Sequence, residues 1–406
     1  MRPDPFLDRS AVFCVAGKND IAVRCLIHLL ELGLEPAQIR VVLNKDDLGR
    51  SAWQHSLGFH ARRLGVRVCE LDEIKPLKGL WLFSVEFDRI LRPEEFASHR
   101  LYNVHFSKLP AYRGVATSVW PILRGELETG VTFHGIDAGV DTGPIYHQRV
   151  FALGENWTAR DLYFRYLSEG FVLFCESLAL LRAGASVPSP QDAASATLFR
   201  RRDLDFKRLV VDPALSAREV HNQIRAYSFW EYQLPLIAGR KVWSSRRIPG
   251  PAGGPPGALR ELDRWHSVLS AADGDLEIHF SPYDELYAWA NGGSAMPDLK
   301  SVPDLELEDE QGWSTMMKAA NSGNITALRA LVMAGASPKR ANRRGTTPLM
   351  YAFSRMIEKK DSAAFRLLLE LGADPMARDQ HDRSISDYVS AADHARLRLE
   401  FPSIFR

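Results

Sequence analysis

Three polar residues, Asn103, His105 and Asp141, have the types and spacing that suit acid–base chemistry. Asn103 and His105 stand two residues apart in a predicted strand, so their side chains project from the same face. Asp141 follows in a turn flanked by glycines, where its carboxylate could approach the imidazole. An amide donor for an oxyanion, an imidazole base and an orienting carboxylate would together support acyl transfer, and no metal is required.

Each of these motifs alone is more often structural than catalytic. An isolated Asn-x-His pair on a strand has no necessary role in a reaction, and an isolated Asp-Thr-Gly is usually only a turn. The functional interpretation therefore depends on a fold that brings the two segments together.

The apolar pattern predicts an α/β first domain with a mostly parallel, open sheet. Strands are expected at 11–16, 39–43, 66–69, 80–85, 102–106 and 130–136. Helices are expected from the N-cap Asp20 to near Gly33, at 53–64, and from about Thr158 to before Gly184. Ligands of such sheets bind beyond the carboxyl ends of the strands.

Beyond Pro188 and Pro190 the pattern changes to short strands separated by turns, which favours a small barrel. These strands are expected at 236–243, 259–262, 267–271 and 276–280. A glycine- and proline-rich insertion at 249–257 interrupts them, and 291–304 has the composition of an interdomain linker.

The last hundred or so residues contain a helical repeat. Segments that begin at Gly312 and Gly345 are similar, and their offset is the 33-residue ankyrin period. Extra residues in the second unit are expected near 355–362, and a degenerate third unit is expected from about Asp382. About three repeats are the minimum for a stable stack, and the neighbouring barrel is a candidate to cover one end.

Composition limits the class of protein. The 406 residues include 51 Lys and Arg and 50 Asp and Glu, so no global field attracts nucleic acid or an anionic membrane. Four scattered cysteines suggest neither a disulfide framework nor a zinc site. The charged start, Met1 to Ser10, and the short apolar run behind it do not fit a secretion signal or a membrane span, so a cytoplasmic protein is expected.

Several motifs closely resemble the folate-dependent formyltransferases: the Asn103/His105 pair, LPAYRG at 109–114 and DTG at 141–143. The resemblance covers roughly 11 to 290 and includes PGAL at 256–259 and DG at 273–274, landmarks of an OB-like second domain. The stretches VAGKN at 15–19, FSVEFD at 83–88 and NVHFS at 103–107 look most like sugar N-formyltransferases that act on dTDP-linked amino sugars. Some of those enzymes also carry ankyrin repeats.

The resemblance implies a division into a formyltransferase catalytic domain at 1–187, an OB-like β subdomain with a dimer contact at 188–295, and ankyrin repeats at 305–406. It implies formyl transfer from 10-formyltetrahydrofolate to the amine of a dTDP-linked amino-dideoxyhexose, for O-antigen or another surface polysaccharide. His105 would be the base, Asn103 the oxyanion donor and Asp141 the group that orients His105. The sequence does not reveal whether the amine is on C3 or C4; the 3-amino position is favoured.

The remaining site residues fall into two groups. By resemblance, the folate cosubstrate would contact Phe83, Ser84, Val85, Ile136 and Asp137. The sugar nucleotide would contact Lys18, Asn19, Tyr112, Arg225, Tyr227, Trp230 and Tyr232. The segment 221–233, dense in aromatic and amide residues, could instead be the seam between two domains, and Tyr112 could belong to a structural loop.

Two other interpretations remain open. Methionyl-tRNA formyltransferase shares the fold, although a net charge of +1 fits a polyanionic substrate less well. The chain could also be an interaction protein in which the ankyrin repeats bind a partner and the enzyme body is a scaffold. A further hypothesis is that Trp313, with Tyr351, forms an auxiliary nucleotide-sugar site in the repeats, since a tryptophan is a good platform for a flat ring. A homodimer is expected from the family.

Overall fold

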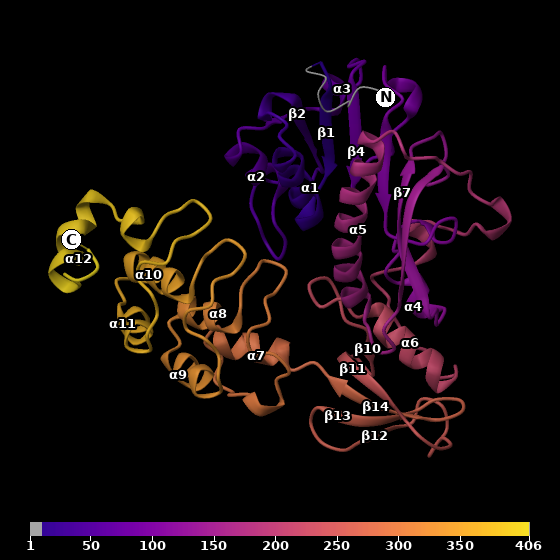
Figure 1. Ribbon diagram of the computed structural model, residues 1–406. Helices are drawn as coiled ribbons and strands as arrows, with labels where there is room; N and C mark the ends of the chain where they lie inside the picture. The colour runs from indigo at the N-terminus through magenta and orange to yellow at the C-terminus, as the bar shows by residue number, and fades with distance from the viewer. Residues whose placement is uncertain (1–9, 406) are drawn as a thin grey trace. The chain divides into compact units, whose positions relative to one another are not determined.

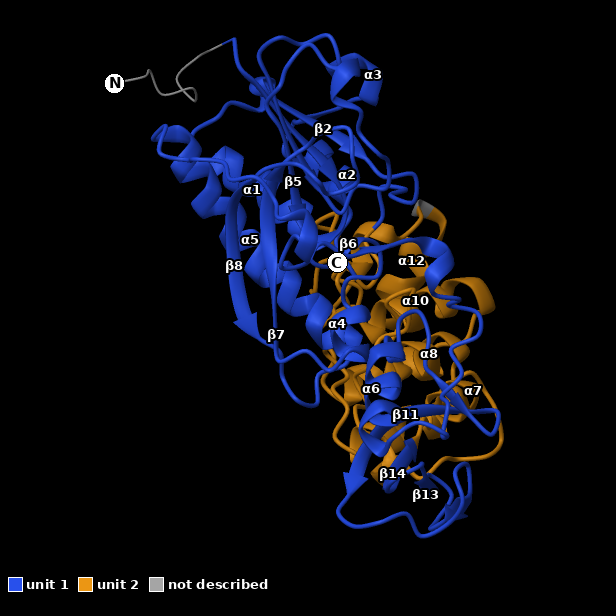
Figure 2. Ribbon diagram, turned by 90° about the vertical axis from the view of Figure 1, so that its right-hand side faces the viewer, with its two compact units in different colours: residues 1–50, 54–279 blue, residues 51–53, 280–406 orange. Residues whose placement is uncertain are grey.

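The computed structural model describes residues 10–405, which form two compact units (Figure 2). The first unit contains the described residues up to Arg50 and Gln54–His279, and the second contains Ser51–Trp53 and the chain from Phe280. Most of the Met1 to Ser10 stretch lies outside the described residues.

A seven-stranded sheet in the order β3-β2-β1-β4-β5-β7-β8 organises the first unit (Figure 1). Its strands are β1 (Val12–Gly17), β2 (Ile39–Leu43), β3 (Arg67–Val68), β4 (Leu80–Val85), β5 (Leu101–His105), β7 (Glu128–Gly135) and β8 (Ile145–Ala152). The first five strands in this order, β3-β2-β1-β4-β5, pair in parallel with their neighbours. Strand β7 pairs antiparallel with both β5 and β8. The predicted mostly parallel sheet is therefore confirmed.

Strand β8 has no counterpart among the expected strands. Its eight residues are all half-buried or exposed, so they lack the continuous apolar run by which the inner strands are recognised. Strand β4, by contrast, is buried along its whole length and has the bounds that the sequence predicts.

Helices cover both faces of the sheet. The first unit contains α1 (Asn19–Glu31), α2 (Leu57–Arg63), α3 (Leu71–Ile74), α4 (Trp120–Leu123), α5 (Ala159–Arg182) and α6 (Ala217–Tyr227). Helices α1 and α5 pack on each other, and α5 also packs on β5 and β7 (Figure 1). On the other side, Cys69, Ile74 and Phe96 join the sheet residues Cys14 and Leu82 in a buried apolar cluster.

Two predicted helix starts are wrong. Helix α1 has its N-cap at Lys18 rather than Asp20. Asp20 lies in the first turn of the helix, where its carboxylate accepts a hydrogen bond from the His55 N–H. Helix α2 begins at Leu57 rather than residue 53, because the Ser56 hydroxyl caps it by accepting from the Phe59 N–H. The start of α5 is confirmed: Thr158 and Asp161 form a capping box.

A smaller five-stranded sheet follows, in the order β10-β11-β14-β13-β12. Its strands are β10 (Leu236–Ile237), β11 (Arg240–Ile248), β12 (Leu259–Glu261), β13 (His266–Ser270) and β14 (Asp275–Phe280). The single strand predicted at 236–243 is a hairpin, because Ala238 and Gly239 both take positive φ angles, the conformation of a tight hairpin turn. In this order β10 and β12 lie at opposite edges, so these pairings do not close a barrel.

The second unit is a stack of short helices (Figure 1). These are α7 (Tyr283–Ala290), α8 (Thr315–Ser322), α9 (Ile325–Met333), α10 (Pro348–Lys359), α11 (Ala363–Glu370) and α12 (Ala391–Glu400). Helix α10 is four residues longer than α8, which confirms the site of the extra residues. The first helix of the third repeat is only a 3-10 turn, Ile385–Tyr388.

The segment 291–304 is not a linker between the units. Helix α7 packs against α8 and α9, which places it in the second unit rather than in the β subdomain. The Tyr283 hydroxyl exchanges hydrogen bonds with the backbone of Asp304, and this ties 291–304 into the same unit. Helix α7, and not the barrel, therefore packs beside the first repeat.

Candidate active site

The predicted acid–base residues lie together where the parallel part of the sheet ends. Asn103 and His105 occupy alternate positions of β5, and Asn103 pairs with Ser84 of β4 on one side and with His134 of β7 on the other. Asp141 comes from the turn that joins β7 to β8. The side chains of Asn103 and His105 both approach this one carboxylate, as the sequence predicts.

His105 is almost fully buried, and both of its ring nitrogens have neighbours. Nε2 is 2.9 Å from the carbonyl oxygen of Tyr112, and a carbonyl only accepts, so Nε2 carries a hydrogen and donates it. Nδ1 is 3.5 Å from Oδ2 of Asp141. In the neutral ring, Nδ1 is therefore the nitrogen able to take a proton, and the proton would arrive beside a carboxylate.

The Asp141 carboxylate is held as an anion. Its Oδ2 accepts a 2.8 Å hydrogen bond from the Gly114 N–H, and its backbone has a positive φ of 54°. Burial acts to raise the pKa of Asp141, but the His105 and His134 imidazoles and the Gly114 N–H outweigh it and hold the pKa well below its usual range. Asp141 is thus ionised at neutral pH.

His134, for which the sequence indicates no role, fixes the amide of Asn103. Its Nδ1 is 2.7 Å from the Gly135 carbonyl oxygen and so carries the ring hydrogen. The lone pair on Nε2 then accepts from Asn103 Nδ2 at 3.1 Å. Asn103 Nδ2 also lies 3.4 Å from Asp141 Oδ1. The pairing of β5 with β7 brings His134 here, a contact that no local sequence pattern reveals.

The residues predicted to contact folate have distinct surroundings. Phe83 and Val85 are fully buried in β4, so from there only their backbone could face a ligand, while Ser84 lies beside Asn103. The Ile136 N–H donates to the Leu101 carbonyl, and Ile136 packs on the core. Asp137 accepts from the Gly139 N–H and the Thr142 hydroxyl, which shapes the turn that carries Asp141.

Of the residues predicted to contact the sugar nucleotide, Lys18, Asn19 and Tyr112 lie at or near loops after the strands. Lys18 Nζ donates to Asp46 at 2.8 Å, and Asn19 donates to Glu86 and Tyr163. The Tyr112 ring is buried against Phe199, and its hydroxyl donates to Glu126. Tyr112 contacts His105 through its backbone carbonyl. Its buried ring therefore favours the interpretation of Tyr112 as part of a structural loop.

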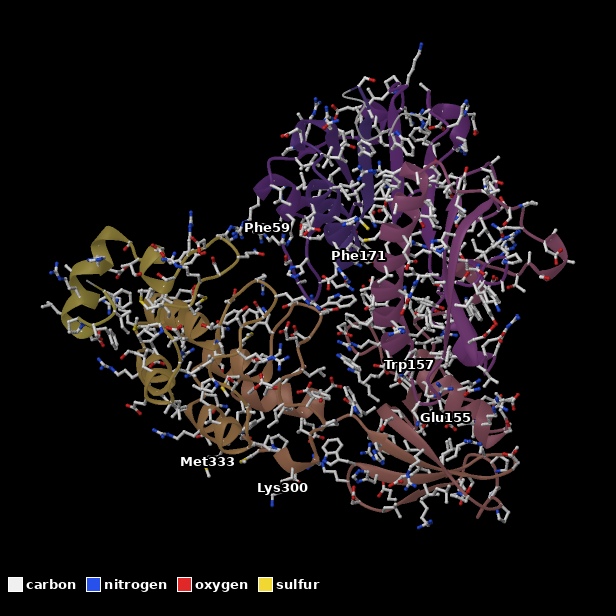
Figure 3. All side chains as sticks on the ribbon, in the orientation of Figure 1. Phe59, Glu155, Trp157, Phe171, Lys300 and Met333 are labelled. Carbon is white, nitrogen blue, oxygen red and sulfur yellow. The ribbon has the colours of Figure 1, made fainter. Side chains whose placement is uncertain are left out.

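The segment 221–233 forms a seam within the first unit. Arg225 is buried and donates to the carbonyl oxygen of Trp157, labelled in Figure 3, and to Asn222. Burial lowers the pKa of Arg225 to about 10. Trp230 stacks on the Arg160 guanidinium, and the Tyr227 phenol is half-buried. These contacts favour the interpretation in which Arg225 belongs to a seam rather than to a ligand site. Tyr232, by contrast, is more than half exposed.

A second polar cluster, the Glu86 cluster (Asn19, Gln54, Glu86 and Tyr163), was not predicted as a unit. Tyr163 donates to Glu86 Oε2 at 3.0 Å, Asn19 donates to the same oxygen at 3.3 Å, and Gln54 donates to the Tyr163 hydroxyl. Burial raises the pKa of Glu86 to about 7. The positive φ angles of Asn19 and Glu86 place both residues in sharp turns directly after β1 and β4.

In the second unit, the Trp313 and Tyr351 rings lie 4.2 Å apart between centroids, and both are half-buried. Arg344 donates to the Tyr351 hydroxyl, and the Lys318 ammonium lies 5.8 Å from the Trp313 ring centroid. The two predicted aromatic residues are therefore brought together, with two cations beside them.

Two properties of the described residues bear on the chemistry. Among residues 10–405, no group of three or more His, Cys, Asp or Glu side chains is arranged to hold a metal ion. None of the described helices combines the length and apolar character needed to cross a bilayer. The four cysteines are free thiols.

Comparison with known proteins assigns a class to both units. A family model for formyl transferase matches residues 72–178, and a model for three ankyrin repeats matches residues 286–379. The molecule thus combines a formyltransferase catalytic unit with ankyrin repeats.

Two solved structures match about two thirds of this chain. An N-formyltransferase from Helicobacter canadensis, crystallised with folinic acid and dTDP-3-aminofucose, is 40% identical, and the match covers 66% of this chain and 99% of that one with a TM-score of 0.63. WlaRD, a sugar 3N-formyltransferase, is 38% identical over 67% and 98% of the two chains, with a TM-score of 0.64. The chain therefore belongs to the formyltransferase family.

Curated relatives include a methionyl-tRNA formyltransferase from Anaeromyxobacter dehalogenans. It is 38% identical over 211 residues, which is 48% of this chain and 67% of that protein. The family is therefore shown by two kinds of relative whose acceptor substrates differ.

Proposed function

We propose that the protein transfers a formyl group from 10-formyltetrahydrofolate to the amine of a dTDP-linked amino-dideoxyhexose, with the 3-amino sugar favoured. The observation that carries the proposal is the 40% identity to an enzyme crystallised with folinic acid and dTDP-3-aminofucose over 99% of that enzyme. The match to methionyl-tRNA formyltransferase stops at 67% of the relative. Such a sugar would belong to O-antigen or another surface polysaccharide, made in the cytoplasm.

The geometry supports a defined division of labour. 10-Formyltetrahydrofolate supplies the formyl group when bound. The acceptor amine attacks the formyl carbon and its proton passes to His105 Nδ1; the carbon–nitrogen bond to the folate then breaks as His105 returns that proton to the folate nitrogen. His105 is steadied in this role by its Nε2–H bond to Tyr112 and by the Asp141 carboxylate beside Nδ1.

Asn103 presents a side-chain amide donor beside this carboxylate. In the proposed reaction one Nδ2 hydrogen stays on His134, and the other leaves the long 3.4 Å contact with Asp141 to bind the formyl oxygen as negative charge develops there. The exchange is favourable because a weak contact is replaced by a strong one.

Mass spectrometry tests the proposal directly. The protein is incubated with 10-formyltetrahydrofolate and, separately, with dTDP-3-amino sugars, dTDP-4-amino sugars and initiator methionyl-tRNA. A gain of one formyl group on a 3-amino sugar is expected. Formylation of the tRNA alone would establish the rival enzyme, and the absence of any product with an intact, folded protein would favour the scaffold interpretation.

The ankyrin unit is proposed to hold a second nucleotide sugar at Trp313 and Tyr351. The paired rings could take a base, and Lys318 and Arg344 could take a diphosphate. Titration of the dTDP-sugar into Trp313→Ala is expected to show one site fewer than wild type. Unchanged stoichiometry and kinetics would remove this site and leave a protein partner for the repeats.

A homodimer through the β subdomain is proposed as the assembly. Val210 and Leu236 form a parallel bridge, and both are about half exposed or more, which leaves an apolar edge that a second copy could cover. Light scattering is expected to give twice the mass of 45.6 kDa. A Leu236→Glu variant should then give the single mass.

A further inference from the structure

The segment 187–199, here called the strap, follows α5 and binds both the turn that carries Asp141 and the loop of Tyr112, whose carbonyl oxygen contacts His105. The sequence suggests that a separate domain begins at residue 188, yet the strap pairs with the catalytic unit at both of its ends. Ser189 and Ile145 exchange two backbone hydrogen bonds of 2.8 Å. At the other end, β9 (Leu198–Phe199) pairs in parallel with β6 (Arg113–Gly114).

Gln191 is the one inward-turned residue of the exposed stretch 187–195, and it is half-buried. Its Nε2 donates to the carbonyl oxygens of Asp141 at 2.8 Å and Gly143 at 2.7 Å. Its Oε1 accepts from Nε and Nη2 of Arg113 at 3.2 and 2.8 Å. All four hydrogen-bonding positions of the amide are used, and only this orientation satisfies two carbonyls and a guanidinium.

Thr197 holds the second loop. Its hydroxyl accepts from the Tyr112 N–H at 2.7 Å, and its carbonyl accepts from the Arg113 N–H. The strap also explains Gly114, because a Cβ at this position would lie 2.0 Å from the Phe199 carbonyl oxygen. Tyr112 and Gly114 are the two residues whose backbones bind His105 and Asp141.

We infer that the strap positions the catalytic pair, with Gln191 fixing the turn of Asp141 and Thr197 fixing the loop that holds His105. Asp141 has a left-handed backbone conformation, which non-glycine residues adopt only when their surroundings impose it. The two carbonyl bonds from Gln191 provide that constraint. Gln191 and Thr197 are positioning residues, since neither touches His105 or the Asp141 carboxylate in these contacts.

Two substitutions separate the donor half of Gln191 from its acceptor half. Gln191→Ala removes all four bonds, whereas Gln191→Glu keeps an acceptor for Arg113 but presents a carboxylate to the carbonyls of Asp141 and Gly143. Both variants are expected to lower kcat by about 10- to 100-fold with little change in KM, because displacement of a reacting group by about 1 Å costs that much. Ser195→Ala is the matched control, since its hydroxyl bonds only to Asp192 on the strap.

Hydrogen exchange gives a readout that does not depend on activity. Gln191→Ala is expected to speed exchange in peptides spanning 138–145, and Thr197→Val in peptides spanning 108–116, with both variants folded by circular dichroism. A double variant completes the test: after Asp141→Asn has removed the carboxylate, Gln191→Ala should cost much less in kcat than it does alone.

This inference rests on the proposed formyl transfer only for its kinetic readouts. If wild type forms no product with any acceptor, the proposed function fails, and the exchange experiment still decides on the strap. Unchanged exchange at 138–145 in Gln191→Ala would overturn the inference. The inference would also be overturned if Gln191→Glu kept the wild-type kcat. It would be overturned equally if the kcat losses of Asp141→Asn and Gln191→Ala were fully additive in the double variant.

Discussion

Two carboxylates of the catalytic unit, Asp141 and Glu86, differ in their electrostatics. Asp141 lies beside His105 and accepts from the Gly114 N–H, and its pKa is lowered despite burial. Glu86 accepts only from the neutral donors Tyr163 and Asn19 at Oε2, and burial raises its pKa to about 7. At Asp141 the neighbouring imidazoles and a backbone N–H outweigh burial, whereas at Glu86 burial outweighs the Tyr163 and Asn19 hydrogen bonds and the attraction of Lys18.

The largest expected effect comes from removal of His105, the imidazole that lies beside Asp141. His105→Ala should lower kcat by about 10²- to 10⁴-fold, the usual contribution of a general base, while binding of the substrates changes little. Steady-state kinetics with the acceptor found by mass spectrometry measures this. His147→Ala, which lies on β8 near Glu176, serves as a control with wild-type rates.

Asn103→Ala is expected to follow with a loss of about 10²- to 10³-fold in kcat, the usual cost of an oxyanion donor. Asn103→Asp should be at least as slow, because a carboxylate in this position would face Asp141 and could not donate. Should Asn103→Ala retain more than a third of the wild-type kcat, the donor role would be wrong.

His134→Ala should have a smaller effect, of about 10-fold in kcat. The substitution leaves Asn103 in place but removes the acceptor that orients its amide. Because the loss acts through Asn103, it should vanish in an Asn103→Ala background. Additive losses in the double variant would show that His134 acts independently.

Glu86 gives a prediction for stability rather than rate. A folded-state pKa of about 7, above the ordinary glutamate value of 4.5, means that the protonated form stabilises the fold below pH 4.5, and that this stability is lost as the pH rises through 7. Glu86→Gln mimics the protonated form, so it should be more stable than wild type by about 3 kcal/mol at pH 8 and nearly equal at pH 4. Urea unfolding at the two pH values measures the difference; a gap of equal size at both would contradict the assignment.

The contribution of Asp141 to the free energy of unfolding should depend on pH in the opposite direction, with a smaller change over the pH range that can be measured. Its lowered pKa contributes stability that is present above the unfolded-state value of about 4 and is lost as the pH falls below it. Asp141→Asn is therefore expected to flatten the acid limb of the stability curve. Thermal melts between pH 3 and pH 7 would detect this, and parallel curves for variant and wild type would contradict it.

Local sequence patterns predicted the parts of the fold that depend on local signals. Strands β2 and β4 have the predicted bounds, because their apolar runs are continuous, and the approach of Asn103 and His105 to Asp141 follows from strand alternation and a glycine-flanked turn. The ankyrin period located the helices of the second unit.

What the sequence did not reveal depends on long-range contacts. His134 meets Asn103 only through antiparallel strand pairing, and Glu86 meets Tyr163 only because α5 packs over the sheet. The start of α2 was missed because the Ser56 cap is weaker as a signal than the aromatic residues before it. Arg225 reads as a ligand-binding cation from its type alone, whereas its surroundings bury it.

The course of the strap bears on how the enzyme can be divided. A fragment that ended at Val187 would retain Asn103, His105 and Asp141. It would lack Gln191, which binds the turn of Asp141, and Thr197, which binds the loop of Tyr112. The smallest autonomous transferase should therefore extend at least through Phe199, and an inserted tag should not be tolerated between that residue and α5.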